Sequence, residues 1–153
     1  MSHTQRLAEL GIVLPPAKAP AFAYVPVAVH GRLAWVSGQL PWVGDQLMAT
    51  GKLGAEIDVE RGREVARCCL LNGLAVLQAA IGSLDRVERV VKMTGFVASA
   101  DGFLQQPAVV DGASSLLGDI FGEAGRHARS AVGVAELPRG VPVEIEFVAA
   151  ISA

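Results

Sequence analysis

Charged side chains interrupt the C-terminal stretch ARSAVGVAELPRGVPVEIEFVAAI, which runs from Ala128 to Ile151. The stretch alternates in the manner of β-strands, yet it contains Arg129, Glu144 and Glu146. An arginine side chain can hold a carboxylate through two parallel hydrogen bonds, and a glutamate can accept or donate a proton. A solvated strand face is the simpler interpretation of such charges, so the elements that position them must decide between the two.

The segment Leu137–Gly140 (LPRG) has the composition of a tight turn, so the C-terminal stretch is predicted to be a hairpin. If Glu136 pairs with Val141, the residues of the two strands sort onto two faces. The face toward the core carries Val132, Val134, Val143, Ile145 and Phe147. The opposite face carries Arg129, Ala131, Gly133, Glu144, Glu146 and Val148. A sheet face that is partly charged and partly apolar suits a subunit interface containing a polar cleft.

The rest of the chain predicts an α+β fold, a sheet backed by two helices, in one domain spanning residues 1–153. A short helix over 4–10 and the proline-rich segment LPPAKAP form an N-terminal arm, residues 1–22, that lies on the domain. Two strands surround a turn at His30-Gly31. A long helix runs from the N-cap Asp58 to Ile81 and stops at Gly82. A strand over 86–99 and a second helix over 105–122 complete the pattern.

Composition limits the classes of function. Net charge is −2, with 13 Lys and Arg against 15 Asp and Glu, so nucleic acid is a poor candidate partner, and Trp35 and Trp42 are assigned to packing. No apolar run is long enough to span a bilayer and no signal peptide is indicated, which predicts a cytoplasmic protein without a membrane partner. Cys68 and Cys69 are adjacent in the long helix, and no metal site or cofactor is expected.

Two segments, YVPVAVHGRLAWVSGQLP and ARSAVGVAELPRGVPVEIEFVA, resemble the two signature regions of the RidA (YjgF-type) family, historically labelled endoribonuclease or translation inhibitor. The resemblance extends from about Tyr24 to Ala149. It implies a chorismate-mutase-like fold and a homotrimer, with sheets around a central barrel and clefts between subunits. Characterised members of the family hydrolyse reactive enamines and imines of the 2-aminoacrylate type to 2-keto acids and ammonia without a cofactor.

The same resemblance assigns residues to a cleft. Arg129 matches the arginine that holds the substrate carboxylate, and Glu144 matches the glutamate associated with the hydrolytic water. Tyr24 matches the cleft tyrosine, and Ser37-Gly38 match a loop of the pocket. Ala131 stands where the best-known members have cysteine, so only its backbone carbonyl would serve there. The leader LAELGIVLPPAKAP and the segment FGEAGRHARS are typical of a divergent branch.

Three classes of function stay open at this point. The first is a cofactor-free imine or enamine hydrolase acting on small carboxylate-bearing substrates. The second is a non-catalytic trimer that binds small carboxylates or 2-keto acids in the same clefts, which the missing cysteine permits. The third is a ribonuclease, which the net charge of −2 and the lack of a catalytic histidine pair argue against. His127 lies beside the arginine motif, where it either enters the cleft or has no role in it.

Overall fold

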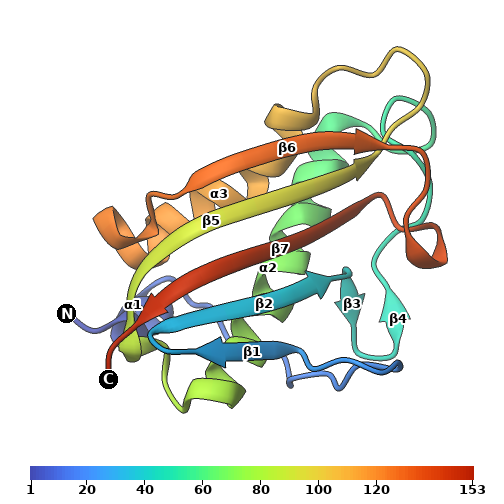
Figure 1. Ribbon diagram of the computed structural model, residues 1–153. Coiled ribbons are helices and arrows are strands. Elements are labelled where there is room, and N and C mark those ends of the chain that lie inside the picture. Colours follow the sequence, from blue (N-terminus) through green and yellow to red (C-terminus); the bar gives the residue numbers. More distant parts are fainter.

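A computed structural model describes the whole chain, residues 1–153, and its main feature is a five-stranded sheet with two long helices on one face (Figure 1). The strand order is β1-β2-β7-β5-β6. The strands are β1 (Val27–His30), β2 (Leu33–Gln39), β5 (Val87–Ala98), β6 (Ala128–Val134) and β7 (Val143–Ile151). Neighbours are antiparallel except β5 and β6, which are parallel. The predicted α+β class, with a mixed sheet backed by two helices, is confirmed.

Helix α2 (Val59–Ile81) has the ends that the sequence predicts. The side chain of Asp58 accepts a hydrogen bond of 2.8 Å from the backbone N–H of Arg61, and Gly82 ends the helix with a φ of 90°. Length and composition alone would let α2 cross a membrane, but 61% of its most apolar window is buried inside the protein. Its apolar side chains are therefore accounted for by the core.

The N-terminal arm reaches two parts of the domain. Helix α1 (His3–Glu9) starts at Ser2, whose side chain accepts a hydrogen bond from the backbone of Gln5, and it places Leu7 in the core beside helix α3 (Gln106–Phe121). The rest of the arm leads without regular structure to β1. On its way it passes a second, small sheet made of β3 (Trp42–Val43) and β4 (Gln46–Leu47), since Lys18 lies over the ring of Trp42.

The predicted C-terminal hairpin is wrong. Strands β6 and β7 are not neighbours, because β5 lies between them: Arg129 aligns with Met93 on β5, which in turn aligns with Phe147 on β7. The physical reason is that β5, α3 and β6 form a β-α-β unit, whose helical crossover returns the chain parallel to β5. The segment Leu137–Gly140 is part of a connection between β6 and β7 and contains the short 3-10 helix η3 (Pro138–Gly140).

This topology inverts the predicted face of β6 and leaves that of β7 as predicted. Aligned residues on neighbouring strands share a face of the sheet. Arg129, aligned with the buried Met93 and Phe147, therefore points to the side of the helices. Glu144 and Glu146 alternate with the buried residues of β7 and point to the opposite side, which we call the open face.

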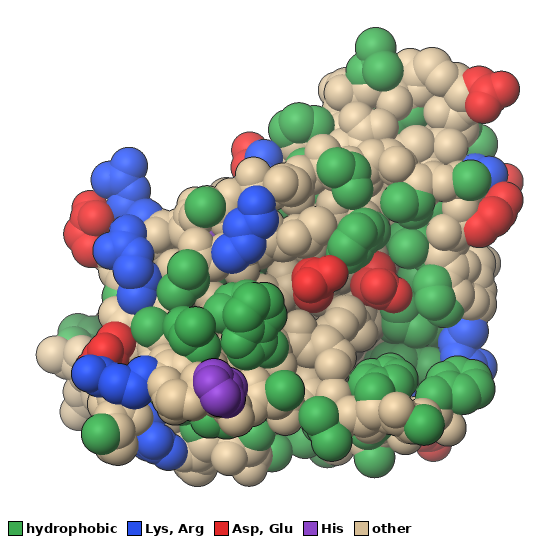
Figure 2. All heavy atoms as spheres, viewed as in Figure 1, with side chains coloured by type: hydrophobic (Ala, Val, Ile, Leu, Met, Phe, Trp, Pro, Cys, Tyr) green, Lys and Arg blue, Asp and Glu red, His purple; other side chains and the backbone are tan.

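The open face carries apolar side chains that nothing in the chain covers. Figure 2 views the molecule from this side and shows hydrophobic side chains between acidic and basic ones. On the strands Trp35 is 53% exposed, Val132 41% and Leu33 37%. The sequence predicts a packing role for Trp35, but within one chain this side chain lacks the neighbours that would bury it.

Candidate functional site

Glu144 is the unusual carboxylate of the open face. It lies on β7 and is only partly exposed, and its carboxylate has no hydrogen bond or ion pair with any other residue of the chain. Burial raises the pKa of its carboxyl group above the ordinary value of 4.5, and the nearby charge of Glu146 raises it further. A half-buried carboxylate without a protein partner is available to water or to a ligand.

Residues at the end of β2 give this carboxylate its space. A Cβ atom at Gly38 would lie 2.6 Å from Oε2 of Glu144, so the glycine leaves the space that the carboxylate occupies. The β2–β7 register is interrupted between Val36 and Gln39, which takes Ser37 and Gly38 out of the regular ladder. The hydroxyl of Ser37 donates a 2.7 Å hydrogen bond to the carbonyl of Val25 and so ties the end of the arm to β2.

Glu144, Gly38 and Tyr24 line one cavity of about 480 Å³. The structure thus brings together three of the residues that the resemblance assigns to the cleft. Ser37 does not line this cavity, and its hydrogen bond to the arm makes it a positioning residue. The cavity is also lined by residues that sequence reasoning left out or assigned to packing, namely Lys18, Phe22, Trp42 and Arg139.

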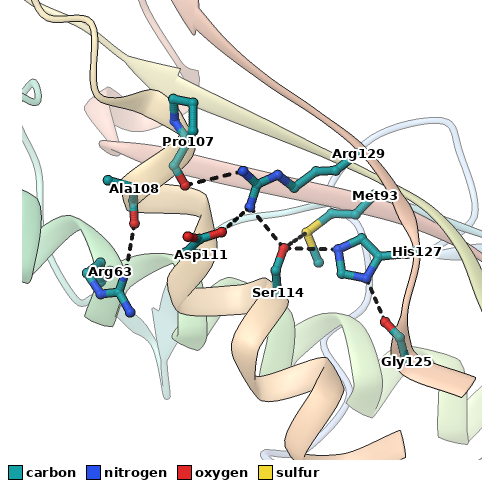
Figure 3. Close-up of polar contacts among 9 residues, drawn as sticks. All are labelled: Arg63, Met93, Pro107, Ala108, Asp111, Ser114, Gly125, His127 and Arg129. Atoms are coloured by element: carbon teal, nitrogen blue, oxygen red, sulfur yellow. Dashed lines mark hydrogen bonds and ion pairs between the residues drawn. The ribbon is translucent and has the colours of Figure 1, made fainter. Parts of the chain in front are cut away.

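Arg129 belongs to a different part of the molecule, between β6 and α3 (Figure 3). Its Nη1 forms an ion pair of 2.5 Å with Oδ1 of Asp111 and donates a 3.1 Å hydrogen bond to Oγ of Ser114. Its Nη2 donates a 3.4 Å hydrogen bond to the carbonyl of Pro107. The side chain is 22% exposed, so the guanidinium is held in place by α3 while part of its surface stays accessible.

His127 lies next to this arginine and contacts the same Ser114 hydroxyl, as Figure 3 shows. Its Nδ1 lies 2.7 Å from the carbonyl oxygen of Gly125, and its Nε2 lies 2.9 Å from Oγ of Ser114. Because a carbonyl only accepts, Nδ1 donates to Gly125, and the Ser114 hydroxyl lies between Nε2 of the ring and the guanidinium of Arg129. His127 therefore orients Ser114, which in turn accepts from Arg129.

One chain does not bring Arg129 and Glu144 together. They point to opposite faces of the sheet and lie on strands separated by β5, which spaces those strands by about 9.5 Å. Ala131 shares the face of Arg129 and packs against the core from the helix side. The prediction that Arg129, Ala131 and the two glutamates share a face is wrong, because it assumed a direct pairing of β6 with β7.

Some of the missed residues had a weak signal in the sequence. Asp111 and Ser114 are three apart in α3 and so lie on one side of the helix, next to the strand that carries Arg129. Arg139 lies between a proline and a glycine, where a turn was expected. Lys18 had no signal at all, since nothing local tells where an arm without regular structure will lie.

The two cysteines contribute neither to the cavity of Glu144 nor to the surroundings of Arg129. Cys69 is fully buried, and burial raises the pKa of its thiol well above the ordinary value of 9.0, which keeps it in the unreactive thiol form. The thiol of Cys68 also has a raised pKa, again mainly through burial. No three His, Cys, Asp or Glu side chains come together in an arrangement that could hold a metal ion.

The fold agrees with what comparison with known proteins finds. A model of the family described as "YjgF/chorismate_mutase-like, putative endoribonuclease" matches residues 4–141. The chain therefore belongs to the YjgF/RidA-type family, and its α+β fold is the chorismate-mutase-like fold of that family. It is 48% identical over 141 residues to Protein TCP17 of Trypanosoma cruzi, a match that covers 92% of this chain and 88% of that protein.

Two solved structures show how far the likeness extends. The crystal structure of a protein from Shewanella oneidensis, described as a putative endoribonuclease, is 32% identical with a TM-score of 0.95 and covers 99% of this chain and 100% of the other. Its likeness thus includes the N-terminal arm. Escherichia coli TdcF, solved with bound serine, is 28% identical with a TM-score of 0.67, and the match covers 92% of this chain and 98% of TdcF.

Proposed function

We propose that the chain hydrolyses small 2-imino acids, and the enamines in equilibrium with them, to 2-keto acids and ammonia in a cleft between two copies of itself. The observation that carries this proposal is the partnerless, half-buried carboxylate of Glu144 at the wall of a cavity of about 480 Å³. A carboxyl group with a raised pKa is a stronger base than an exposed glutamate, and this suits proton transfer near neutral pH.

The reaction requires few catalytic groups from the protein. Water adds to the carbon of the protonated C=N bond while the Glu144 carboxylate takes a proton from it, which leaves a hydroxyl and an amine on one tetrahedral carbon. The same carboxyl group then gives this proton to the nitrogen, the C–N bond breaks, and ammonia leaves. The hydroxyl proton passes to the freed Glu144 carboxylate and then to solvent, so the carbon keeps a C=O bond. One water is consumed, one ammonia is released, and no oxidant or metal is needed. Positioning supplies most of the acceleration, because the imine carbon is already electrophilic.

Arg129 is proposed to hold the substrate carboxylate, and it does so from the neighbouring copy. Its guanidinium is already oriented by Asp111 and Ser114, so little side-chain freedom is lost when a carboxylate binds. The assembly proposed is a homotrimer in which the open faces surround a central barrel. The exposed apolar side chains of the open face, Trp35 and Val132 among them, support a surface that is covered in the assembly.

The relatives support a small carboxylate-bearing ligand better than they support RNA. Serine, the molecule bound to TdcF, carries a carboxylate and a nitrogen on adjacent carbons, as a 2-imino acid does. The family description names an endoribonuclease, but a net charge of −2 is unsuited to a polyphosphate ligand. In addition, the ring nitrogens of His127 are engaged by Ser114 and Gly125.

The test is a competition between hydrolysis and chemical trapping of an imine that is generated during the assay. An amino-acid oxidase acting on alanine releases 2-iminopropanoate, which semicarbazide traps unless hydrolysis comes first. We expect the wild-type protein to lower the yield of trapped imine, and the Glu144→Gln variant to restore it. If the wild-type protein binds pyruvate but leaves the trapped yield unchanged, the chain is a binding protein that uses the same cleft, and the proposed hydrolysis is wrong.

A further inference from the structure

The cavity that contains Glu144 has a second wall whose character is cationic. The indole of Trp42 has Nζ of Lys18 at 4.4 Å from its ring centroid and Cζ of Arg139 at 5.2 Å from the same centroid. All three side chains line the cavity together with Glu144. We call these three residues, which come from the arm, from β3 and from η3, the cationic wall.

The two cations of this wall are compensated by the chain only in part. Arg139 is exposed and has no hydrogen bond or ion pair through its guanidinium. Lys18 has one ion pair, at 3.6 Å, with Asp45, which also lines the cavity and has a side chain that is 103% exposed. An ion pair that is open to water in this way contributes almost nothing, so it does not hold Lys18 back from a ligand. Contact with an aromatic face keeps both cations near the cavity without satisfying their charge.

The backbone at Arg139 adds an independent observation. Arg139 is the one residue other than glycine with a positive φ, at 58° with ψ at 15°, and Gly140 follows it with a φ of 73°. A left-handed backbone disfavours an arginine and costs a glycine nothing. In this conformation the guanidinium lies over Trp42 and lines the cavity.

The size of the cavity agrees with a ligand longer than the simplest imine. A volume of about 480 Å³ falls within the range of pockets that enclose drug-sized molecules, roughly 300–1,000 Å³. A three-carbon imino acid, held by its carboxylate at Arg129 of the next copy and by its reacting carbon near Glu144, would leave the cationic wall without a partner.

We propose that the cationic wall binds a second, terminal carboxylate, so that the preferred ligands are 2-imino acids and 2-keto acids with an acidic side chain. This inference rests on the proposed function, because it assumes that the first carboxylate is bound by Arg129. The guanidinium of Arg139 meets the terminal carboxylate through its planar fork, and the ammonium of Lys18 adds a point charge. A ligand with an apolar end leaves both cations solvated and gains nothing from them.

The inference is tested with two keto acids of equal length. 2-Oxoglutarate and 2-oxopentanoate both have five carbons, and only the first ends in a carboxylate. Titration calorimetry of the wild-type protein should show 2-oxoglutarate binding about 10- to 100-fold more tightly, as expected for added charge-assisted hydrogen bonds. Arg139→Gly, which fits the left-handed backbone, should remove most of this ratio, because it weakens 2-oxoglutarate far more than 2-oxopentanoate.

A control separates the wall from net charge. The guanidinium of Arg67 is exposed on α2, has no hydrogen bond or ion pair and does not line the cavity, so Arg67→Gln removes one positive charge outside the cavity wall. This variant should keep the wild-type ratio, and Lys18→Gln should lower it. Equal binding of the two acids by the wild-type protein, or an unchanged ratio in Arg139→Gly, would overturn the inference and leave the proposed function standing. Binding of neither acid at millimolar concentration would overturn both.

Discussion

Glu144, on the central strand of the sheet, and Arg129, on an edge strand, are both partly buried, but their surroundings differ in kind. The guanidinium of Arg129 has an acidic partner, a hydroxyl and a carbonyl, all supplied by α3. The carboxylate of Glu144 has no protein partner and loses solvent without compensation, which raises its pKa. The cation is thus fixed before any ligand arrives, whereas the anion is kept reactive. A binding group and a proton-transferring group call for these two opposite environments.

The largest effect is expected for Glu144, the carboxylate without a protein partner. Glu144→Gln keeps the size of the side chain and removes its ability to accept a proton. We expect the hydrolysis rate to fall by about 10²- to 10⁴-fold, the usual contribution of a general base. Thermal stability should not fall, because a carboxylate without partners is replaced by a neutral group. A rate within threefold of wild type would show that another group transfers the proton.

The next effect concerns the fixed cation. Arg129→Lys keeps a charge near Asp111 but loses the planar fork, so we expect kcat/KM to fall about 10- to 100-fold. Most of the loss should be in KM, since Arg129 is proposed to bind and not to transfer protons. Titration with pyruvate gives an independent readout. If pyruvate affinity is the same in both proteins and the assembly is intact, Arg129 is not the carboxylate anchor.

A smaller effect is expected at Gly38, which leaves room for the Glu144 carboxylate. Gly38→Ala would place a Cβ atom 2.6 Å from Oε2 of Glu144, so the carboxylate must turn away from its position. We expect about a tenfold loss of rate, since misplacing a catalytic group by about 1 Å can cost up to 10² in rate. Gly118→Ala is the matched control, because a Cβ at that position in α3 meets nothing within 4 Å. Equal rates in the two variants would mean that the position of Glu144 is not critical.

The smallest effect is a change in pH dependence. A carboxyl whose pKa is raised by folding holds more protons in the folded state, so stability falls as pH rises from about 4.5 through the raised folded pKa of Glu144. Glu146→Gln removes the lesser cause of the shift and leaves burial, the main one. Both this loss of stability and the acid limb of kcat/KM should therefore move to lower pH. Melting curves and rates between pH 4 and 8 measure this, and a shift to higher pH would contradict the electrostatic explanation.

Local patterns predicted the parts of the fold that local interactions determine. The caps of α2 at Asp58 and Gly82 are properties of a few adjacent residues, and both are confirmed. The alternation of β7 likewise predicted which residues are buried, and Glu144 and Glu146 lie on the open face. The match to the family motifs also predicted Tyr24 and Gly38 as cleft residues, and both line the same cavity as Glu144.

Sequence patterns did not predict which strands pair over long distances along the chain. A turn-like LPRG segment between two strands looks the same whether the strands pair with each other or with a third, and here β5 separates them. The cationic wall was missed for a related reason, because Lys18 and Arg139 meet on Trp42 from distant points of the chain. Neither result can be read from a window of neighbouring residues.

The central claim is that Glu144 and Arg129 act on one ligand from two different chains. Two proteins that are each inactive, Glu144→Gln and Arg129→Gln, are unfolded together in equal amounts, refolded, and assayed for imine hydrolysis. In a cyclic trimer every mixed assembly contains one cleft with both native residues, so the mixture should recover about a quarter of wild-type activity. The separately refolded proteins should stay inactive. Absence of recovery in mixtures that sedimentation shows to be mixed assemblies would contradict the claim.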